Sequence, residues 1–403
     1  MKVLALGGSG GMGRWAARTA ATLQEVEQLV VADLNGESAV EFACTLGPKA
    51  KGIALDVTDP DALHSALTQA DAVLNTVGPF YRFGTLVLQA AIRAKCHYVD
   101  ICDDWEPTLE LLALDEEARE AGITGVLGMG ASPGLTNMFA VLAMRELDST
   151  EDLYTGWNLE GTAPEPESSQ QGVNAALVHG MQQATGSIRV FRDGVVREEP
   201  PLIRLEIDYP GVGRRPVWTF GHPESLTFPE YYPDLKSSLN VTFAPPSEIL
   251  SMRCLRWLVD RHLLSATRAA AIFEWYERHK KPVEPTELLQ EDLLPPVFGA
   301  ARGKKDGKPA WAGVAQTGFA GGMGEITGVP MAVTLRLLAK GQITKHGVFA
   351  PEGCIDPDAF FEALVPYCGD FASRPEDIYT ITKSWDPGAK DVFAAVVKGV
   401  HGT

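Results

Sequence analysis

The first 33 residues constrain the fold of this chain most, because two apolar runs flank a glycine-rich turn. Lys2–Leu6 is a short apolar run that leads directly into Gly7–Gly13, and a helix-compatible segment follows over Arg14–Leu23. A second apolar run, Gln28–Ala32, ends at Asp33. This order predicts a strand, a tight turn, a helix and a second, parallel strand, which together form one βαβ unit.

The spacing of the glycines indicates what this unit binds. Three of them fit the pattern G-x-G-x-x-G, and an acidic residue lies twenty positions after the last one. Glycine lets a pyrophosphate approach the backbone and the helix start, and the acid accepts hydrogen bonds from a ribose hydroxyl. We therefore predict a nicotinamide dinucleotide site made by Gly8, Ser9, Gly10, Gly11, Met12, Gly13, Asp33, Leu34 and Asn35.

The acidic residue also bears on which dinucleotide is used. Asp33 is followed by Leu34-Asn35-Gly36, with no adjacent Arg or Lys. A 2′-phosphate beside this carboxylate would be repelled and would find no neighbouring cation in the sequence. We expect NAD to be preferred, with NADP as the alternative.

The alternation of strand-like and helix-like segments continues to about residue 130. It predicts an α/β domain of the Rossmann type, a doubly wound parallel sheet with helices on both faces, complete with six strands over residues 1–130. After the first two, the expected strands are Gly52–Asp56, Ala72–Thr76, His97–Asp100 and Thr124–Leu127; the expected helices between and after them are Gly36–Leu46, Pro60–Gln69, Gly84–Ala94 and Pro107–Glu120.

Polar residues and turns follow several of these strands. In doubly wound sheets, ligands bind outside the carboxyl ends of the strands, so these residues are candidates for the site, although each alone fits an ordinary turn. We expect Asp56 and Val57 at the adenine edge, Asn75, Gly78 and Pro79 beside the nicotinamide ribose and phosphates, and Asp100, Cys102 and Asp103 near the reacting centre.

The pattern changes after the sixth strand. Gly130–Asn137 is a turn-rich junction whose amides could bind a carboxylate, or which could serve only as a linker. Residues 131–325 then predict an inserted α+β second domain. Its expected strands are Leu153–Leu159, Ser187–Arg192, Leu202–Asp208 and Val217–Phe220; its expected helices are Gly172–Ala184 and Leu250–Leu264; Thr162–Gln171 is expected to be a surface loop, Ala320–Gly324 a close-packed turn, and Met331–Lys340 and Asp358–Leu364 are expected to be C-terminal helices.

Composition excludes several functional classes. The chain has 35 basic and 52 acidic residues, a formal net charge of −17, which argues against nucleic acid or an anionic membrane as partner. No apolar run approaches the roughly 20 residues that span a bilayer. The six cysteines show no C-x-x-C pair, so we expect neither a metal site nor a disulfide framework, and we expect a cytoplasmic protein.

Taken together, the motifs resemble one known family, the saccharopine dehydrogenase-like NAD(P)-dependent oxidoreductases. The segments that carry the resemblance are Gly8–Gly13, Asn75–Tyr81, Ala90–Ile92 leading to His97–Asp100, Gly130–Asn137, Gly221–Glu224, Thr327–Pro330 and Gly347–Glu352. The resemblance implies C-terminal helices over 326–403 that return to the Rossmann domain, and a middle domain that supplies substrate and subunit contacts, so a homodimer is expected.

The resemblance also implies a chemistry. Members oxidise or reduce a C–N bond of an amino acid or a polyamine. In saccharopine reductases, an Asp precedes the Pro-Gly pair of the junction and a His ends it, whereas this chain has Ser132 and Asn137, a form more similar to lysine 6-dehydrogenase. The implied substrate contacts are Tyr98, Cys102, Ser132, Pro133, Gly134 and Asn137, and the implied catalytic residues are Asp103, His222 and Glu224, with His222 as the candidate for proton transfer.

Two other functions stay open at this point. A C=C (enoyl) reductase of the same family would need a wide apolar pocket, which the aromatic residues Trp218, Phe220, Phe228, Tyr231 and Tyr232 could line, although such residues more often form a core. A non-catalytic sensor would bind NAD(H) and change partners with redox state.

Overall fold

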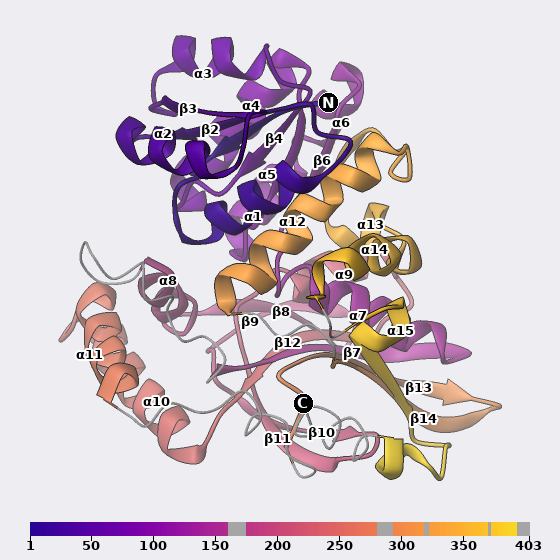
Figure 1. The fold of residues 1–403 in the computed structure, drawn as a ribbon. Helices are drawn as coiled ribbons and strands as arrows, with labels where there is room; N and C mark the ends of the chain where they lie inside the picture. The colour runs from indigo at the N-terminus through magenta and orange to yellow at the C-terminus, as the bar shows by residue number, and fades with distance from the viewer. Residues whose placement is uncertain (160–174, 280–292, 318–321, 370–371, 393–403) are drawn as a thin grey trace. The chain divides into compact units, whose positions relative to one another are not determined.

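The chain forms two compact units in the computed structural model, which describes residues 1–159, 175–279, 293–317, 322–369 and 372–392 (Figure 1). The first unit comprises Met1–Leu135 and Met323–Pro375, and the second comprises Thr136–Gly322 and Glu376–Thr403. The expected loop Thr162–Gln171 and the start of the expected turn, Ala320 and Gly321, lie outside the described residues.

A parallel sheet forms the first unit, and the predicted doubly wound α/β fold is confirmed. Its strands are β1 (Lys2–Leu6), β2 (Gln28–Asp33), β3 (Ala50–Ala54), β4 (Ala72–Asn75), β5 (His97–Asp100), β6 (Thr124–Val126) and β15 (Gly347–Phe349). They lie in the order β15-β6-β5-β4-β1-β2-β3, and every neighbouring pair is parallel. The order reverses between β1 and β4, the position at which doubly wound sheets bind ligands.

The helices of this unit begin where the sequence offers caps. Asn35 and Asp59 accept hydrogen bonds from amides of the first turns of α2 and α3, which satisfies donors that a helix start leaves unbonded. The helices are α1 (Gly11–Thr22), α2 (Gly36–Thr45), α3 (Pro60–Leu67), α4 (Phe80–Ala94), α5 (Trp105–Leu112), α6 (Asp115–Ala121), α12 (Met323–Ala339), α13 (Pro351–Cys354) and α14 (Pro357–Leu364), with a 3₁₀ turn at Val365–Tyr367.

The single helix expected over Pro107–Glu120 is wrong, because the chain makes two. Leu114 is buried, and its amide donates to the carbonyl of Leu111, which closes α5 with a tighter turn. Asp115 then begins α6, and its carboxylate accepts the amide of Val348 in β15. The break therefore places one apolar side chain in the core and one acidic side chain against the edge strand.

Residues Met323–Pro375 return to the first unit, as predicted, and they add a strand as well as helices. The prediction for 326–403 is wrong at its end, because Glu376–Thr403 belong to the second unit, where Tyr379–Lys383 joins the sheet. Six strands were expected, and the seventh, β15, has only three residues, too few for a recognisable pattern. Helix α12 packs against α1 (Figure 1). A Cβ atom on Gly328 would lie 2.7 Å from the backbone of Met12 and Ala16, so these two helices meet at backbone distance. Helix α12 also begins at Met323, well before the expected Met331, and contains Pro330.

A mixed sheet of nine strands forms the second unit, in agreement with the predicted α+β class. The order is β10-β11-β12-β7-β13-β14-β16, and β8 pairs with β12 and β9. The strands are β7 (Ser149–Asn158), β8 (Ile188–Arg192), β9 (Val195–Glu199), β10 (Arg204–Tyr209), β11 (Gly213–Thr219), β12 (Ser237–Phe243), β13 (Val297–Lys305), β14 (Lys308–Gln316) and β16 (Tyr379–Lys383); the helices are α7 (Leu135–Arg145), α8 (Ala175–Gln183), α9 (Glu224–Tyr231), α10 (Pro246–Asp260), α11 (Ala266–His279) and α15 (Pro375–Ile378).

Strand β12 is buried along its whole length, although its sequence has no continuous apolar run. Its polar side chains Ser238, Asn240 and Thr242 hydrogen-bond inside the unit, which offsets the cost of burying them. This strand was not expected, because an apolar period was the signal sought. Among the described residues, no helix has the length and apolar character needed to cross a membrane.

Candidate functional site

The glycine turn between β1 and α1 contains two kinds of glycine. Gly13 is required by packing, because a Cβ atom there would lie 2.1 Å from the carbonyl oxygen of Gly7. Gly8 is also confined, with Ala5 O at 2.8 Å from such an atom. At Gly10 the nearest atom would be 3.2 Å away, and at Gly11 nothing lies within 4 Å. The protein itself therefore explains Gly8 and Gly13 but leaves open space at Gly11.

A hydrogen-bonded corner forms where β2 ends. The Ser9 hydroxyl donates to Oδ2 of Asp33 over 2.7 Å, and the Asn35 amide lies 3.3 Å from Oδ1. Arg14 Nε donates to the Ser9 carbonyl oxygen over 2.6 Å, and its guanidinium lies over the Phe42 ring. A cation therefore contacts the glycine turn next to Ser9, although no basic residue adjoins Asp33 in the sequence. Leu34 is 74% exposed.

The side chains at the ends of β4 and β5 are closed onto one another. Tyr98 accepts a hydrogen bond from Asn75 Nδ2 over 2.9 Å and donates one to Asp100 Oδ2 over 2.8 Å. The other oxygen, Asp100 Oδ1, accepts the amides of Cys102 and Gly128. Asn75, Tyr98 and Asp100 are each 0% exposed. These residues were predicted to contact a ligand, but their side chains are buried. They can influence a ligand only by positioning the backbone to which they hydrogen-bond.

Burial has the largest effect on the pKa values of these groups. It raises the pKa of Asp100 to about 6, and the amides of Gly128 and Cys102 and the Tyr98 hydroxyl oppose that rise. Burial raises the pKa of Tyr98 well above its usual value, and nearby Asp100 adds to the effect. The pKa of the Cys102 thiol is raised in the same way, so this cysteine stays protonated and is no nucleophile.

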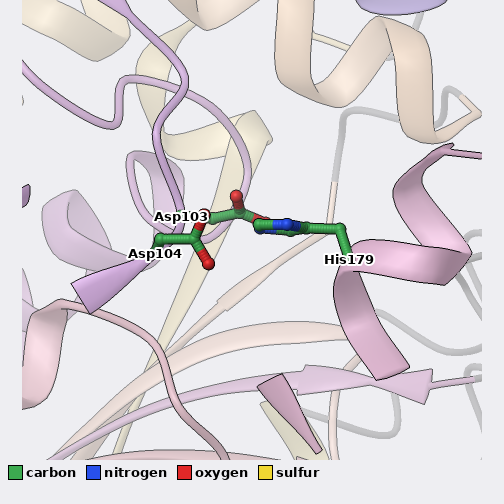
Figure 2. A group of neighbouring side chains, drawn as sticks. All are labelled: Asp103, Asp104 and His179. Carbon is green, nitrogen blue, oxygen red and sulfur yellow. The ribbon is translucent and has the colours of Figure 1, made fainter. Parts of the chain in front are cut away.

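The remaining predicted residues of this edge are more accessible. Asp103 and Asp104 follow β5 and are both half-buried (Figure 2). The histidine in that view, His179, belongs to α8 of the second unit. Gly78 is exposed and Pro79 begins α4. On the far side of the sheet, Val57 is buried, while Asp56 is exposed, and its hydrogen bonds from Thr58 hold its pKa below the usual value.

The junction after β6 is a closed turn. Gly134 adopts a φ of +118°, and a Cβ atom there would lie 2.1 Å from Gly130 O, so only glycine fits. Gly130 N donates to Pro133 O, and Leu135 N donates to Gly130 O. Ser132 is half-buried, whereas Asn137, two residues into α7, is 0% exposed. Part of the amide set expected to bind a carboxylate therefore closes the turn itself.

The second unit contains a buried acid–histidine pair. His222 Nδ1 lies 3.8 Å from Glu224 Oε2, and the side chains are 6% and 1% exposed. Glu224 Oε1 accepts hydrogen bonds from the Thr136 hydroxyl over 3.0 Å and from Asn240 Nδ2 over 3.1 Å. Two of the residues predicted to be catalytic, His222 and Glu224, therefore lie next to each other.

The surroundings of this pair include residues that the sequence did not single out. The indole of Trp157 stacks on the His222 ring at 5.5 Å between centroids and donates Nε1 to Asn240 Oδ1. Asn240 also contacts Thr155. Sequence spacing could not reveal these partners, because they come from two strands that are far apart in the chain. The aromatic residues considered for an apolar pocket, Trp218 and Phe220, belong instead to the core of this unit.

Comparisons with known proteins agree with the fold described above. Residues 3–126 match the family model of the saccharopine dehydrogenase NADP binding domain. The solved apo structure of saccharopine dehydrogenase (L-Glu forming) from Saccharomyces cerevisiae aligns with a TM-score of 0.63 at 19% identity, over 95% of this chain and 99% of that one. The chain has the saccharopine dehydrogenase fold.

Two sequence relatives are named as dehydrogenases. Carboxyaminopropylagmatine dehydrogenase of Synechocystis sp. is 24% identical over 390 residues, covering 89% of this chain and 94% of the relative. Saccharopine dehydrogenase (NADP(+), L-glutamate-forming) of Pyricularia oryzae is 31% identical over 262 residues, covering 62% and 56%. Residues 3–126 are thus similar to a saccharopine dehydrogenase NADP binding domain, and the chain is similar in sequence to dehydrogenases. The likeness to lysine 6-dehydrogenase rests on the junction turn alone, because these relatives have other names.

Proposed function

We propose that this protein transfers a hydride between a nicotinamide cofactor and a carbon that bears nitrogen, in an amino acid or a related amine. The observation that carries the cofactor part is the open space at Gly11 beside the confined Gly13. The pattern leaves the backbone of the turn accessible at the positive end of α1, where a pyrophosphate binds in such folds. When bound, the nicotinamide supplies or accepts the hydride.

Residues on the two halves of the sheet would bind different halves of the cofactor, each at the carboxyl ends of its strands. Asp33 and Asn35 would hold the adenosine ribose beyond β2, with Asp56 and Val57 at the adenine edge. The backbone at Gly78 and Pro79 would lie along the nicotinamide side, beyond β4. In doubly wound sheets, a dinucleotide lies across the switch point between β1 and β4.

NAD is the proposed cofactor, because the carboxylate of Asp33 stands where a 2′-phosphate would have to lie. Ser9 and Asn35 orient this carboxylate, and it still has the capacity to accept ribose hydroxyls. Arg14 favours the alternative, NADP, since its guanidinium contacts the same turn. Asp33 ends β2, where such folds bind the adenosine ribose, whereas Arg14 donates to the Ser9 carbonyl, so we rank repulsion of the phosphate above attraction.

The substrate class rests on the names of the relatives and on the acid–histidine pair. Two relatives are named as dehydrogenases of carboxyaminopropylagmatine and of saccharopine, and both of these compounds contain amino groups. Oxidation of an amine carbon requires that a proton leave nitrogen. His222 is the proposed proton acceptor, and Glu224 orients it and stabilises its charged form. Asp103 is proposed to hold a substrate ammonium, and amides of the turn at Ser132–Asn137 its carboxylate, with Pro133, which has no amide hydrogen, only shaping that turn.

One experiment tests the reaction type. Purified protein is mixed with NAD or NADP and each of a panel of amino acids and diamines, and reduced-nicotinamide absorbance is followed. Reverse reactions use NADH with keto acids and amines, and parallel wells contain enoyl substrates. Turnover of an amine or imine substrate supports the proposal. Turnover of enoyl substrates alone points to a C=C reductase, and cofactor binding without any turnover points to a sensor.

The proposal extends to assembly and compartment. We propose a homodimer in the cytoplasm, with subunit contacts from the second unit, as the family resemblance implies. Sedimentation at several protein concentrations checks the stoichiometry. A monomer at all concentrations would remove the dimer from the proposal without affecting the reaction.

A further inference from the structure

Three buried side chains at the ends of β4 and β5 have polar atoms that are satisfied by one another and by backbone amides. The Val77 amide donates a hydrogen bond to Asn75 Oδ1, and Asn75 Nδ2 donates one to the Tyr98 hydroxyl. It continues from that hydroxyl to Asp100 Oδ2. Burying three polar groups in a sheet interior is costly unless each finds a partner. This set meets that condition.

The amides at the two ends of this network belong to three different loops. Val77 precedes Gly78 and Pro79 after β4. Cys102, whose amide donates to Asp100 Oδ1 over 3.0 Å, precedes Asp103 after β5. Gly128, whose amide donates to the same oxygen over 2.7 Å, precedes the closed turn after β6. These loops follow β4, β5 and β6, three of the four strands on the β4 side of the switch point.

We propose that Asn75, Tyr98 and Asp100 form a positioning network that sets the three loops around the nicotinamide half of the cofactor, without touching the cofactor themselves. This inference rests on the proposed function, since it presumes that a nicotinamide cofactor binds. The adenosine half depends on β1, β2 and the glycine turn. Asn75 pairs with Leu6 of β1 through the backbone, but the side-chain hydrogen bonds of the network involve no atom of β1, β2 or the glycine turn. Loss of one member therefore affects one half of the cofactor only.

The Tyr98 hydroxyl is the most informative atom, because it connects Asn75 to Asp100. Tyr98→Phe removes one oxygen and keeps the buried ring in place. Asp100→Asn keeps the shape of the side chain but removes the charge and one acceptor. The matched controls are Tyr209→Phe, at another fully buried tyrosine, in the second unit, and Asp115→Asn, at a carboxylate that also accepts a strand amide.

The experiment compares two ligands by calorimetry at a temperature at which all variants are folded. NADH probes the whole site, and AMP probes the adenosine half. We expect Tyr98→Phe and Asp100→Asn to weaken NADH binding about tenfold, the effect of one buried partner lost, with AMP affinity unchanged. The controls should keep both affinities. Because both variants remove the same hydrogen bond, the double variant should lose less than the product of the two single effects.

Each outcome decides the question. Equal losses for NADH and AMP, or unchanged NADH affinity in a folded Tyr98→Phe variant, would overturn the positioning role while leaving the cofactor site standing. If the wild-type protein binds neither NADH nor NADPH, the proposed function fails, and the inference fails with it. If Asp100→Asn does not fold, Tyr98→Phe alone gives the same comparison.

Discussion

A Cβ atom on Gly13 would lie 2.1 Å from the carbonyl oxygen of Gly7, whereas one on Gly11 would meet nothing within 4 Å. The first contact is with backbone, which cannot move aside without shifting β1 or α1. We expect Gly13→Ala to lower the free energy of unfolding by about 1–3 kcal/mol, as overpacking does. Gly11→Ala should leave stability nearly unchanged but weaken cofactor binding. Urea unfolding and cofactor titration of both variants separate these effects, and equal stabilities for the two would contradict the packing argument.

The carboxylate of Asp33 is predicted to select NAD. Asp33→Asn keeps the side-chain shape and removes the charge that repels a 2′-phosphate. We expect it to weaken NADH binding about tenfold, through loss of a charged acceptor, and to improve NADPH binding relative to NADH. Arg14→Gln should lower NADPH affinity more than NADH affinity. Tighter binding of NADPH than NADH by the wild-type protein would reverse the assignment, with Arg14 as its cause.

The glycine turn, the parallel sheet and the mixed second sheet could be predicted, because each depends on a short pattern in the sequence. The spacing of Gly8, Gly10 and Gly13 is local, and so is the position of Asp33 at the end of β2. The seventh strand, Gly347–Phe349, could not be predicted, since three residues carry no period. Strand β12 was missed for a different reason: Asn240 and its neighbours are polar, and only long-range hydrogen bonds make their burial acceptable.

The sequence could indicate which residues lie near the site, but not what each of them does there. Asn75, Tyr98 and Asp100 were expected to contact ligands, because polar residues at strand ends usually do. Their hydrogen bonds to each other depend on the register of β4 against β5, which pairs Asn75 with Asp100. The surroundings of His222 depend likewise on the parallel pairing of β12 with β7. Such registers are set by the packed sheet and leave no local signal.

The raised pKa of Asp100 predicts a pH dependence of stability. Its carboxyl titrates near ~3.9 in an unfolded chain and at about 6 in the folded one. The folded state therefore holds the proton more tightly, so this group's stabilising contribution is full below the unfolded pKa and is lost as the pH rises through the folded pKa.

Asp100→Asn removes this titration. Between about pH 4 and pH 7, the free energy of unfolding of the wild-type protein should fall relative to that of the variant by up to about 3 kcal/mol. Urea unfolding at several pH values measures the difference. A change of opposite sign would mean that the amides of Gly128 and Cys102 outweigh burial.

Removal of the proposed proton acceptor should affect turnover but not cofactor binding. We expect His222→Gln to lower kcat by about 10²- to 10⁴-fold, the range for loss of a general acid or base, and to flatten the pH profile of kcat. Glu224→Gln should have a smaller effect, since the histidine remains. His64→Gln, at an exposed position on α3, is the control. Unchanged turnover and pH profile in His222→Gln would remove this residue from the mechanism.

The central claim is that hydride moves between a nicotinamide and a carbon bearing nitrogen, and an isotope measurement tests it most directly. NADH carrying deuterium at both C4 positions is incubated with the protein and the imine-forming pair that gives turnover, and the amine product is analysed by mass spectrometry and NMR. The account predicts one deuterium, on the carbon bonded to nitrogen. Deuterium at a carbon not bonded to nitrogen, or a product without deuterium, would contradict it.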